Sequence, residues 1–234
     1  MPQVIVALDY ASAPEALRMV ERLGEGADFY KVGLELYTRA GPDLVRDLTG
    51  QRKRVFLDLK LHDIPNTVIG AVRAARDLGV QMLTVHTTGG RPMMEAAAGA
   101  AGEDMTLLGV TLLTSLSPND IESAWGRSIG SLREEVVRLA TLARDSGLRG
   151  IVASPQEAQA VRRRLGKDMI VVTPGIRLPG GDTHDQARVA TPAQAARAGA
   201  DYLVIGRAVT GATDPEGALD KVRRSLEPTP RSKG

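Results

Sequence analysis

The sequence contains no cysteine, and this absence excludes several kinds of chemistry at once. With Cys at 0 among 234 residues, the chain can form no disulfide, no thiolate metal site and no cysteine nucleophile. A chain without disulfides fits a reducing compartment, so we expect a cytoplasmic protein.

Long apolar runs are also missing. No stretch of about 18 apolar residues occurs, which is the length that a membrane-spanning helix needs. The first ten residues, MPQVIVALDY, carry neither a cationic lead nor a long apolar segment. We therefore expect neither secretion nor a membrane span.

An excess of charge of one sign is the third feature that the sequence lacks. Lys and Arg total 30 against 28 Asp and Glu, and the basic residues are spread along the chain. This distribution does not indicate a nucleic-acid partner. Histidine is scarce as well, since His62, His86 and His184 stand apart without a tight group of carboxylates. Their separation argues against a zinc site.

What is present is a regular alternation of two patterns. Short apolar runs typical of strands occupy Val4–Asp9, Phe29–Gly33, Arg54–Lys60, Gln81–His86, Met105–Leu113, Gly150–Ser154, Met169–Gly175 and Tyr202–Gly206. Segments with apolar residues three and four apart, typical of helices, separate them. These are APEALRMVERLG, TVIGAVRAARDLG, PMMEAAAGAAG, LREEVVRLATLARDSG, SPQEAQAVRRRLG and TPAQAARAGA.

This alternation predicts a parallel sheet covered by helices. About eight strands in 234 residues, 43% of them hydrophobic, favour a single-domain (β/α)8 TIM barrel over residues 1–234. A doubly wound open sheet is the alternative. From about residue 227 the tail EPTPRSKG is expected to be solvated and frayed.

Polar residues gather where these predicted strands end. Asp9, Lys31, His86, Thr114, Arg177 and Arg207 all lie at or just after such an end. Barrel enzymes place their catalytic groups there. Scattered surface charges would show no such preference.

The stretch FLDLKLHDIPNT, residues 56–67, concentrates charge at the end of the third predicted strand. Residues two apart in a strand share a face, so Asp58 and Lys60 are expected to point inward together. Asp63 lies beyond the strand and either bends back or reaches a neighbour. Nearby carboxylates keep Lys60 an ammonium, which is a proton donor aimed at developing negative charge. A structural ion-pair cluster is the alternative interpretation, but Lys31 at the same rim extends the row and favours a functional network.

Several motifs together resemble the orotidine 5'-monophosphate decarboxylase family along nearly the whole chain. They are VALD (6–9), KVG (31–33), FLDLKLHDIPNT, TVH (84–86), VTLLTS (110–115), TPGIR (173–177), Asp185 and Gln186 with Arg188, and IGRAVT (205–210). The resemblance implies decarboxylation of orotidine monophosphate to uridine monophosphate, the last step of de novo pyrimidine synthesis. It implies neither a metal nor an organic cofactor.

The resemblance also implies a role for each matching residue. Lys60 would protonate C6 of the pyrimidine, and Asp58 would lie against the substrate carboxylate. Asp63 of the partner subunit would hold Lys60, which makes the protein a homodimer with shared sites. The remaining substrate contacts would come from Asp9 and Lys31 at the ribose, Thr67 from the partner, Ile64, and Thr114 at the pyrimidine edge.

The loops after the seventh and eighth strands are the expected phosphate subsite, as in many barrels. Arg177 and Arg207 can fork onto phosphate oxygens, Gln186 can donate from its amide, and the Gly206 amide can point inward. The segment 178–186, with Gly180 and Gly181, is predicted to be a lid.

Two other functions remain as alternatives. A magnesium-dependent sugar-phosphate decarboxylase or aldolase of the same superfamily shares DxKxxD. Those enzymes resemble one another in an acidic metal ligand near the end of the second strand, where this chain has Lys31. The other alternative is a catalytically silent nucleotide-binding barrel that serves as a regulator or scaffold.

Overall fold

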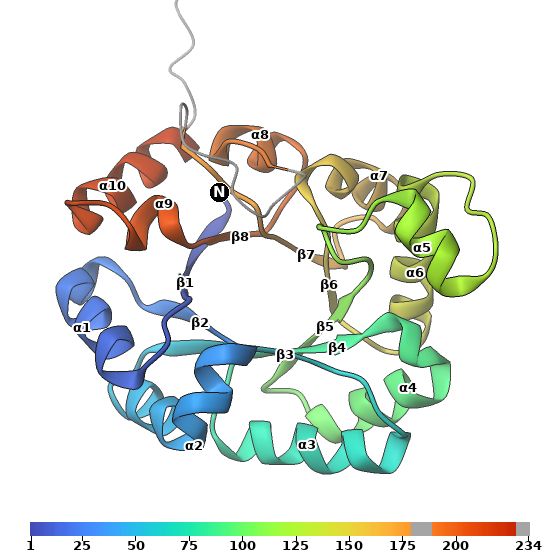
Figure 1. The fold of residues 1–234 in the computed structure, drawn as a ribbon, viewed down its shortest axis with the longest axis horizontal. Helices are drawn as coiled ribbons and strands as arrows, with labels where there is room; N and C mark the ends of the chain where they lie inside the picture. Colours follow the sequence, from blue (N-terminus) through green and yellow to red (C-terminus); the bar gives the residue numbers. More distant parts are fainter. Residues whose placement is uncertain (179–188, 228–234) are drawn as a thin grey trace, which may run out of the picture.

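Eight parallel strands close into a barrel in the computed structural model, which describes residues 1–178 and 189–227. Each strand pairs with its neighbour in the chain, and β1 pairs with β8 to complete the ring (Figure 1). The strands are β1 (Gln3–Leu8), β2 (Phe29–Gly33), β3 (Arg54–Leu61), β4 (Met82–His86), β5 (Thr106–Val110), β6 (Gly150–Val152), β7 (Ile170–Thr173) and β8 (Tyr202–Ile205). The predicted (β/α)8 barrel is therefore confirmed, and the open sheet is excluded.

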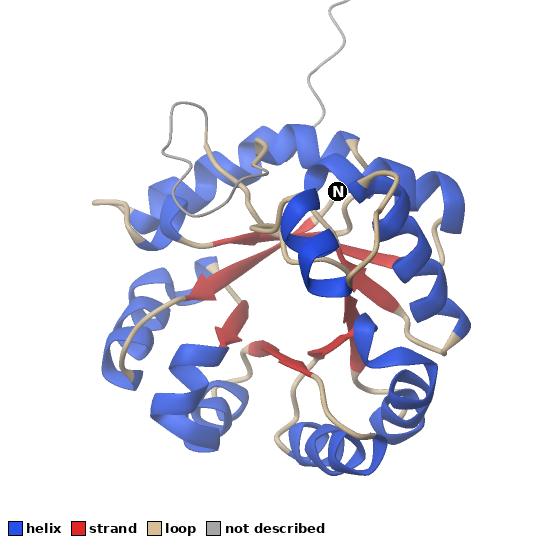
Figure 2. Ribbon diagram, turned by 45° about the vertical axis from the view of Figure 1, so that its right-hand side comes forward, coloured by secondary structure: helices blue, strands red, loops and turns tan. Residues whose placement is uncertain are grey.

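Helices surround this ring of strands on the outside (Figure 2). They are α1 (Ala13–Leu23), α2 (Leu34–Gly50), α3 (Pro65–Asp77), α4 (Gly90–Ala101), α5 (Pro118–Trp125), α6 (Leu132–Asp145), α7 (Pro155–Leu165), α8 (Pro192–Arg197), α9 (Arg207–Thr210) and α10 (Pro215–Leu226). Two short 3-10 turns, η1 (Gly24–Gly26) and η2 (Thr87–Gly89), are also present among the described residues.

Several helices begin at polar caps that are visible in the sequence. The side chains of Ser12, Ser131 and Thr191 each accept a hydrogen bond from a backbone amide of the first turn of α1, α6 and α8. Such a cap satisfies one of the amides that a helix start leaves without a partner. The caps therefore fix where the outer layer begins after three of the strands.

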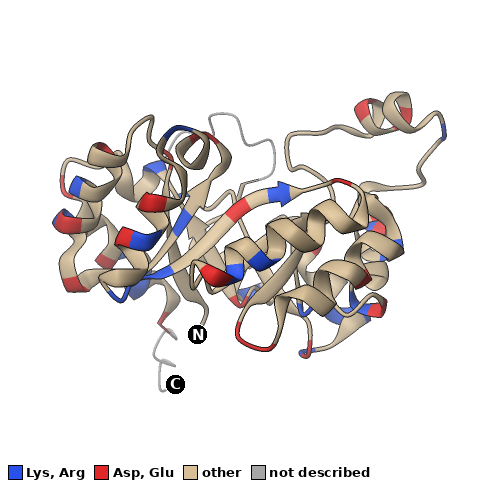
Figure 3. Cartoon of the chain, turned by 90° about the horizontal axis from the view of Figure 1, so that it is seen from below, with Lys and Arg blue, Asp and Glu red and all other residues tan. Residues whose placement is uncertain are grey.

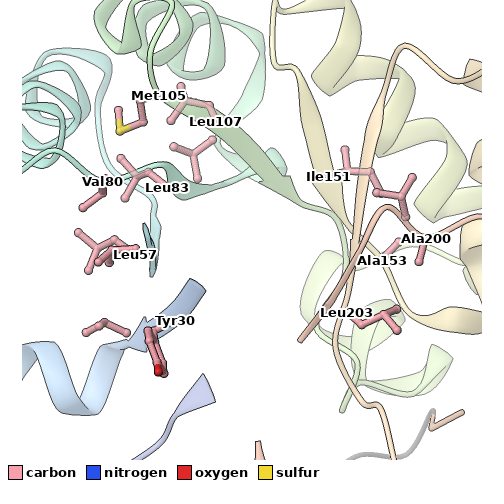
Figure 4. Packing of buried hydrophobic residues seen from close by; sticks show 14 of the residues in the cluster. Tyr30, Leu57, Val80, Leu83, Met105, Leu107, Ile151, Ala153, Ala200 and Leu203 are labelled. Carbon is pink, nitrogen blue, oxygen red and sulfur yellow. The ribbon is translucent and has the colours of Figure 1, made fainter. Parts of the chain in front are cut away.

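Two apolar cores lie on the two faces of the barrel wall. The inner core fills the barrel and consists of Ile5, Ala7, Phe29, Phe56, Met82, Leu108, Val172 and Val204. The outer core lies between strands and helices, where Leu57, Leu83 and Leu107 project from three adjacent strands (Figure 4). Since alternate strand residues face opposite ways, the strands carry apolar residues on both faces and contribute to both cores.

Charge is mixed over the outer surface. Lys and Arg are interspersed with Asp and Glu on the helices seen in Figure 3. The connection between β5 and α6 carries α5 and projects beyond the ring of helices (Figure 1). Within residues 1–178 and 189–227, none of the helices combines the length and the apolar character that crossing a bilayer requires.

Candidate active site

A cavity of about 470 Å³ opens at the carboxyl ends of the strands. Barrel enzymes hold their active sites at this end. Among its lining residues are eight of the predicted site residues, namely Asp9, Lys31, Asp58, Lys60, Thr114, Arg177, Gly206 and Arg207. Leu112, Leu113, Ser115, Pro174 and Gly175 also line it. The cavity thus brings together residues that are nearly 200 positions apart in the sequence.

Four charged side chains form a row along one wall of this cavity. Lys31 Nζ lies 2.9 Å from Asp9 Oδ1 and 3.9 Å from Asp58 Oδ2. Lys60 Nζ lies 2.9 Å from the same Asp58 oxygen. The Lys31 and Asp58 side chains are only 12% and 15% exposed. The charges alternate in sign along the row, so the two largely buried ions, Lys31 and Asp58, each have an opposite charge beside them.

The alternation of the strands explains why these charges meet. Phe29 and Phe56 both belong to the inner core. Lys31, two residues after Phe29, and Asp58, two residues after Phe56, face the same way but stand at the open end of the barrel. The strands β2 and β3 therefore place apolar side chains inside the barrel and charged side chains at its open end.

The backbone of β3 departs from regular strand geometry just where the row ends. Leu57 pairs with Leu83 and Leu61 pairs with Val85, so a step of four positions on β3 faces a step of two on β4. Lys60 has a φ of 50°, in the left-handed region that side chains other than glycine rarely adopt. Such a conformation is typical of functional sites whose surroundings hold it in place.

A buried threonine that the sequence analysis did not single out supports this irregular segment. Thr84 Oγ1 accepts a hydrogen bond of 2.8 Å from the Lys60 amide and donates one of 3.0 Å to Asp58 Oδ1. The alternation of side chains along β4 is the signal that could have identified it. Met82 belongs to the inner core, so Thr84, two residues further on, faces the inside of the barrel as well. Thr84 on β4 therefore hydrogen-bonds to two residues of the charged row, which the sequence motif on β3 does not reveal.

Three predicted site residues lie outside the cavity lining of their own chain. Residues 62–67 are all exposed, and this segment includes Asp63, Ile64 and Thr67. Asp63 Oδ1 accepts a 2.6 Å hydrogen bond from the Ile64 amide. The Ile64 residue is 67% exposed, which is unusual for a large apolar side chain beside an open cavity. In the row of this chain, Asp9 is the outer carboxylate and Asp63 takes no part.

The loops after β7 and β8 also border the cavity. Gly206 lies close to the charged row, because a Cβ at this position would stand 3.3 Å from Asp9 Oδ2. After β7, the Arg177 amide bonds to the Ala190 carbonyl at 3.0 Å, and the Ala190 amide bonds to the Gly175 carbonyl at 3.2 Å. Gln186 and the rest of the predicted lid beyond Leu178 lie outside the described residues.

Two histidine rings stack beside the site without lining the cavity. The centroids of His62 and His86 are 5.5 Å apart, and Thr88 Oγ1 lies 2.7 Å from His86 Nδ1. Burial lowers the pKa of His86, and His62 and Lys60 lower it further. The lowered pKa favours the neutral form of His86 at pH 7, and its ring hydrogen-bonds to Thr88 and does not line the cavity.

Metal ligands do not gather in the part of the chain that the structure describes. In residues 1–178 and 189–227, no three His, Asp, Glu or Cys side chains lie as a metal site would require. Asp9 and Asp58, the two carboxylates of the cavity wall, have the Lys31 ammonium between them. That ammonium places a positive charge between the two carboxylates.

Comparison with known proteins gives a consistent result. Residues 2–222 match the model of the family described as orotidine 5'-phosphate decarboxylase / HUMPS. Orotidine 5'-phosphate decarboxylase of Vibrio parahaemolyticus is 48% identical over 228 residues, which cover 96% of this chain and 97% of that protein. The enzyme of the same name from Moorella thermoacetica is 46% identical over 233 residues, covering 96% and 92%. The crystal structure of orotidine 5'-phosphate decarboxylase from Lactobacillus acidophilus superposes with a TM-score of 0.87 at 36% identity, covering 97% of this chain and 100% of that one.

Proposed function

The chain belongs to the orotidine 5'-phosphate decarboxylase / HUMPS family, and from this premise we propose that it converts orotidine 5'-monophosphate to uridine 5'-monophosphate and carbon dioxide. The observation that carries the proposal is the placement of Lys60. Its ammonium lies 2.9 Å from Asp58 and lines the same cavity as Arg207. A proton donor and a phosphate-binding cation therefore share one cavity.

The chemistry of the reaction suits this arrangement. The bond between C6 and the carboxylate carbon breaks, carbon dioxide leaves, and the electron pair stays on C6. The pyrimidine ring delocalises this pair poorly, so stabilisation has to come from fixed charges nearby. The Lys60 ammonium faces that carbon, gives it a proton and regains one from solvent after the product leaves.

The rest of the row prepares the site for this step. Asp58 lies against the carboxylate of the substrate, and Asp9 and Lys31 bind the ribose hydroxyls. Because Lys31 pairs with Asp9 at 2.9 Å, its side chain is held in place before substrate arrives. A preorganised network needs little rearrangement in the transition state, which is where most electrostatic catalysis originates.

A metal-free mechanism is part of the proposal. The sugar-phosphate enzymes of the superfamily are the main alternative, and they use magnesium. Here Lys31 lies between the two carboxylates of the cavity wall, at 2.9 Å and 3.9 Å, and would repel a divalent cation. Thr114 lines the cavity and can contact the pyrimidine edge. Both features favour a pyrimidine nucleotide as substrate.

The first test is the reaction itself. Purified protein with orotidine monophosphate is expected to show a steady loss of pyrimidine absorbance that a metal chelator does not slow. The control adds magnesium and a sugar phosphate in place of the nucleotide, and no turnover is expected there. A requirement for magnesium, or turnover of the sugar phosphate alone, would favour the alternative enzyme. Tight nucleotide binding without turnover would favour the silent barrel.

Phosphate binding is assigned to the loops after β7 and β8. Arg207 and Arg177 both line the cavity, and Gly206 allows the chain to approach closely. Gln186 is assigned to the same subsite from the sequence alone. Binding energy gained at the phosphate can be used to order the reacting end of the substrate.

Arg207→Ala is expected to raise KM for orotidine monophosphate about 100-fold, since a charge-assisted bidentate contact contributes roughly 1.5–3 kcal/mol. Steady-state kinetics with the nucleotide measures the effect. Orotidine, which lacks the phosphate, supplies the control, because its slow turnover should be nearly the same for the variant and the wild type. An equal loss with both substrates would remove Arg207 from the phosphate subsite.

We propose that the working form is a homodimer in which each site is shared. The exposed segment 62–67 follows the cavity-lining Lys60 in the chain and carries Asp63, Ile64 and Thr67, which can enter the site of a second copy. Exposed Ile64 gives that surface an apolar contact, and Leu34 at the start of α2 is 61% exposed. Location in the cytoplasm stays a prediction from the absence of cysteine.

A further inference from the structure

Thr84 occupies a position in the site that no substrate contact explains. Its residue is fully buried, with an exposed fraction of 0%, beneath the row of charged side chains. Its hydroxyl accepts from the Lys60 amide at 2.8 Å and donates to Asp58 Oδ1 at 3.0 Å. The same hydroxyl therefore accepts a hydrogen bond from one residue of the charged row and donates one to another.

The irregular backbone of β3 is what creates the need for this hydroxyl. In a regular parallel pair, every second amide of β3 would bond to a carbonyl of β4. The shift of register between Leu57 and Leu61 and the positive φ of Lys60 interrupt that ladder. The Lys60 amide then bonds to a side chain, Thr84 Oγ1, at a place where an amide without a partner would be destabilising.

The same hydroxyl also fixes how the Asp58 carboxylate is turned. Thr84 holds Oδ1 at 3.0 Å, which leaves Oδ2 to face Lys60 Nζ at 2.9 Å and Lys31 Nζ at 3.9 Å. Rotation of the carboxylate would break the contact with Thr84 and move the oxygen that both ammonium groups share. Backbone and side chain of the Asp58 to Lys60 segment are thus held from a single point on β4.

We infer that Thr84 is a positioning residue for the decarboxylation, setting the ammonium of Lys60 through the Lys60 backbone and the Asp58 carboxylate. The inference rests on the proposed function for its kinetic consequence. Its structural consequence is independent of the substrate, because it concerns only the positions of Lys60 and Asp58. Thr84 touches neither the reacting carbon nor the phosphate in this assignment.

Thr84→Val is the decisive substitution, since valine keeps the branched shape and removes only the hydroxyl. We expect kcat to fall about 100-fold, which is the effect of a misplacement of about 1 Å at a reacting centre. KM and the affinity for uridine monophosphate should change less than about threefold, because ribose and phosphate contacts remain. Thr84→Ser retains the hydroxyl and is expected to restore most of kcat.

Thr87→Val is the matched control. Thr87 is also fully buried and lies directly after β4. Its hydroxyl donates a hydrogen bond of 2.9 Å to the Val110 carbonyl. The control loses one buried hydrogen bond without touching the charged row. Its kcat should stay within about twofold of wild type once the fraction of folded protein, measured by thermal unfolding, is taken into account. A loss of kcat in Thr84→Val no larger than in Thr87→Val would overturn the inference, and so would failure of Thr84→Ser to restore it.

A crystal structure of Thr84→Val separates this inference from the proposed function. We expect the Lys60 nitrogen to leave its 2.9 Å contact with Asp58 Oδ2, or the φ of Lys60 to depart from 50°. If both features stay unchanged, Thr84 does not position Lys60, whatever the substrate of the wild-type protein. If wild-type protein fails to consume orotidine monophosphate while the variant shows the displacement, the proposed function fails and the structural role of Thr84 stands.

Discussion

Lys60→Ala is expected to lower kcat for orotidine monophosphate by a factor of about 10⁴ or more, because it removes both the proton donor and the nearest positive charge. The barrier to this decarboxylation is high, so the enzyme has to work in the upper part of the range of roughly 8–23 kcal/mol by which enzymes lower barriers. A residual site without the ammonium still binds nucleotide but cannot stabilise the carbanion. The measurement is turnover by absorbance, followed over hours at high enzyme concentration.

Binding of uridine monophosphate should survive this substitution largely intact. Arg207, Arg177 and Gly206 also line the cavity and are unchanged. The fold should survive as well, since Asp58 keeps Lys31 at 3.9 Å as a second cation and Thr84 as a hydrogen-bond donor at 3.0 Å. Titration calorimetry with uridine monophosphate and thermal unfolding check these two expectations.

Two further variants sharpen the result. Lys60→Arg keeps a positive charge but cannot give up its proton near neutral pH, so it separates the charge from the proton transfer. We expect Lys60→Arg to be severely impaired too. Lys221→Ala, on the exposed surface of α10, removes a lysine far from the cavity and should leave kcat unchanged. Turnover by Lys60→Ala above about 1% of wild type would contradict the assignment of the proton donor.

The barrel could be predicted from sequence because each of its strands serves two cores. Phe56 packs inside the barrel and Leu57 packs under the helices, so the run is apolar on both faces and stands out between amphipathic helices. The predicted ends of the strands are less accurate than the predicted number and order of the strands. The run from Met105 to Leu113 was predicted as one strand, whereas β5 covers Thr106–Val110 and the following residues bend over the cavity. Leu112 and Leu113 are apolar because they line the cavity, and they do not extend the strand.

The helix α2 shows where local pattern was insufficient. It is absent from the predicted helical segments, although helical residues extend over Leu34–Gly50. Gly41 has non-helical angles, with a φ of 66°, and Pro42 follows it, so two shorter helices join across a kink. Glycine followed by proline ordinarily ends a helix. Both pieces pack against the outer core, through Leu36 and Leu44.

The charged residues of the site could be predicted because they interrupt apolar strands. Asp58 and Lys60 are conspicuous after Val55, Phe56 and Leu57. Thr84 was missed for the opposite reason, since a threonine within a strand is ordinary and its hydroxyl gains meaning only beside the shifted backbone of β3. Regular alternation predicted that Asp58 and Lys60 share a face, but it could not predict the positive φ that Lys60 adopts to do so.

Mixed dimers test directly whether Asp63 acts across the subunit interface. Asp63→Ala alone is expected to lower kcat about 100-fold, since Lys60 loses an oriented carboxylate. If each site combines Lys60 of one subunit with Asp63 of the other, a dimer of one Lys60→Ala and one Asp63→Ala chain contains one fully native site. An equal mixture after subunit exchange should then recover about a quarter of wild-type activity, because half of the dimers are mixed and half of their sites are native.

The matched control pairs Lys60→Ala with Asp58→Ala. Lys60 and Asp58 lie 2.9 Å apart within one chain, so every site of that mixed dimer lacks one of them and no activity should return. Recovery in the first mixture and none in the second would require Asp63 to act across the interface. If the first mixture stays inactive although exchange is verified by mass, Asp63 must serve the Lys60 of its own chain. The exposed segment 62–67 would then have to fold back over the cavity, breaking the 2.6 Å bond between Asp63 and the Ile64 amide.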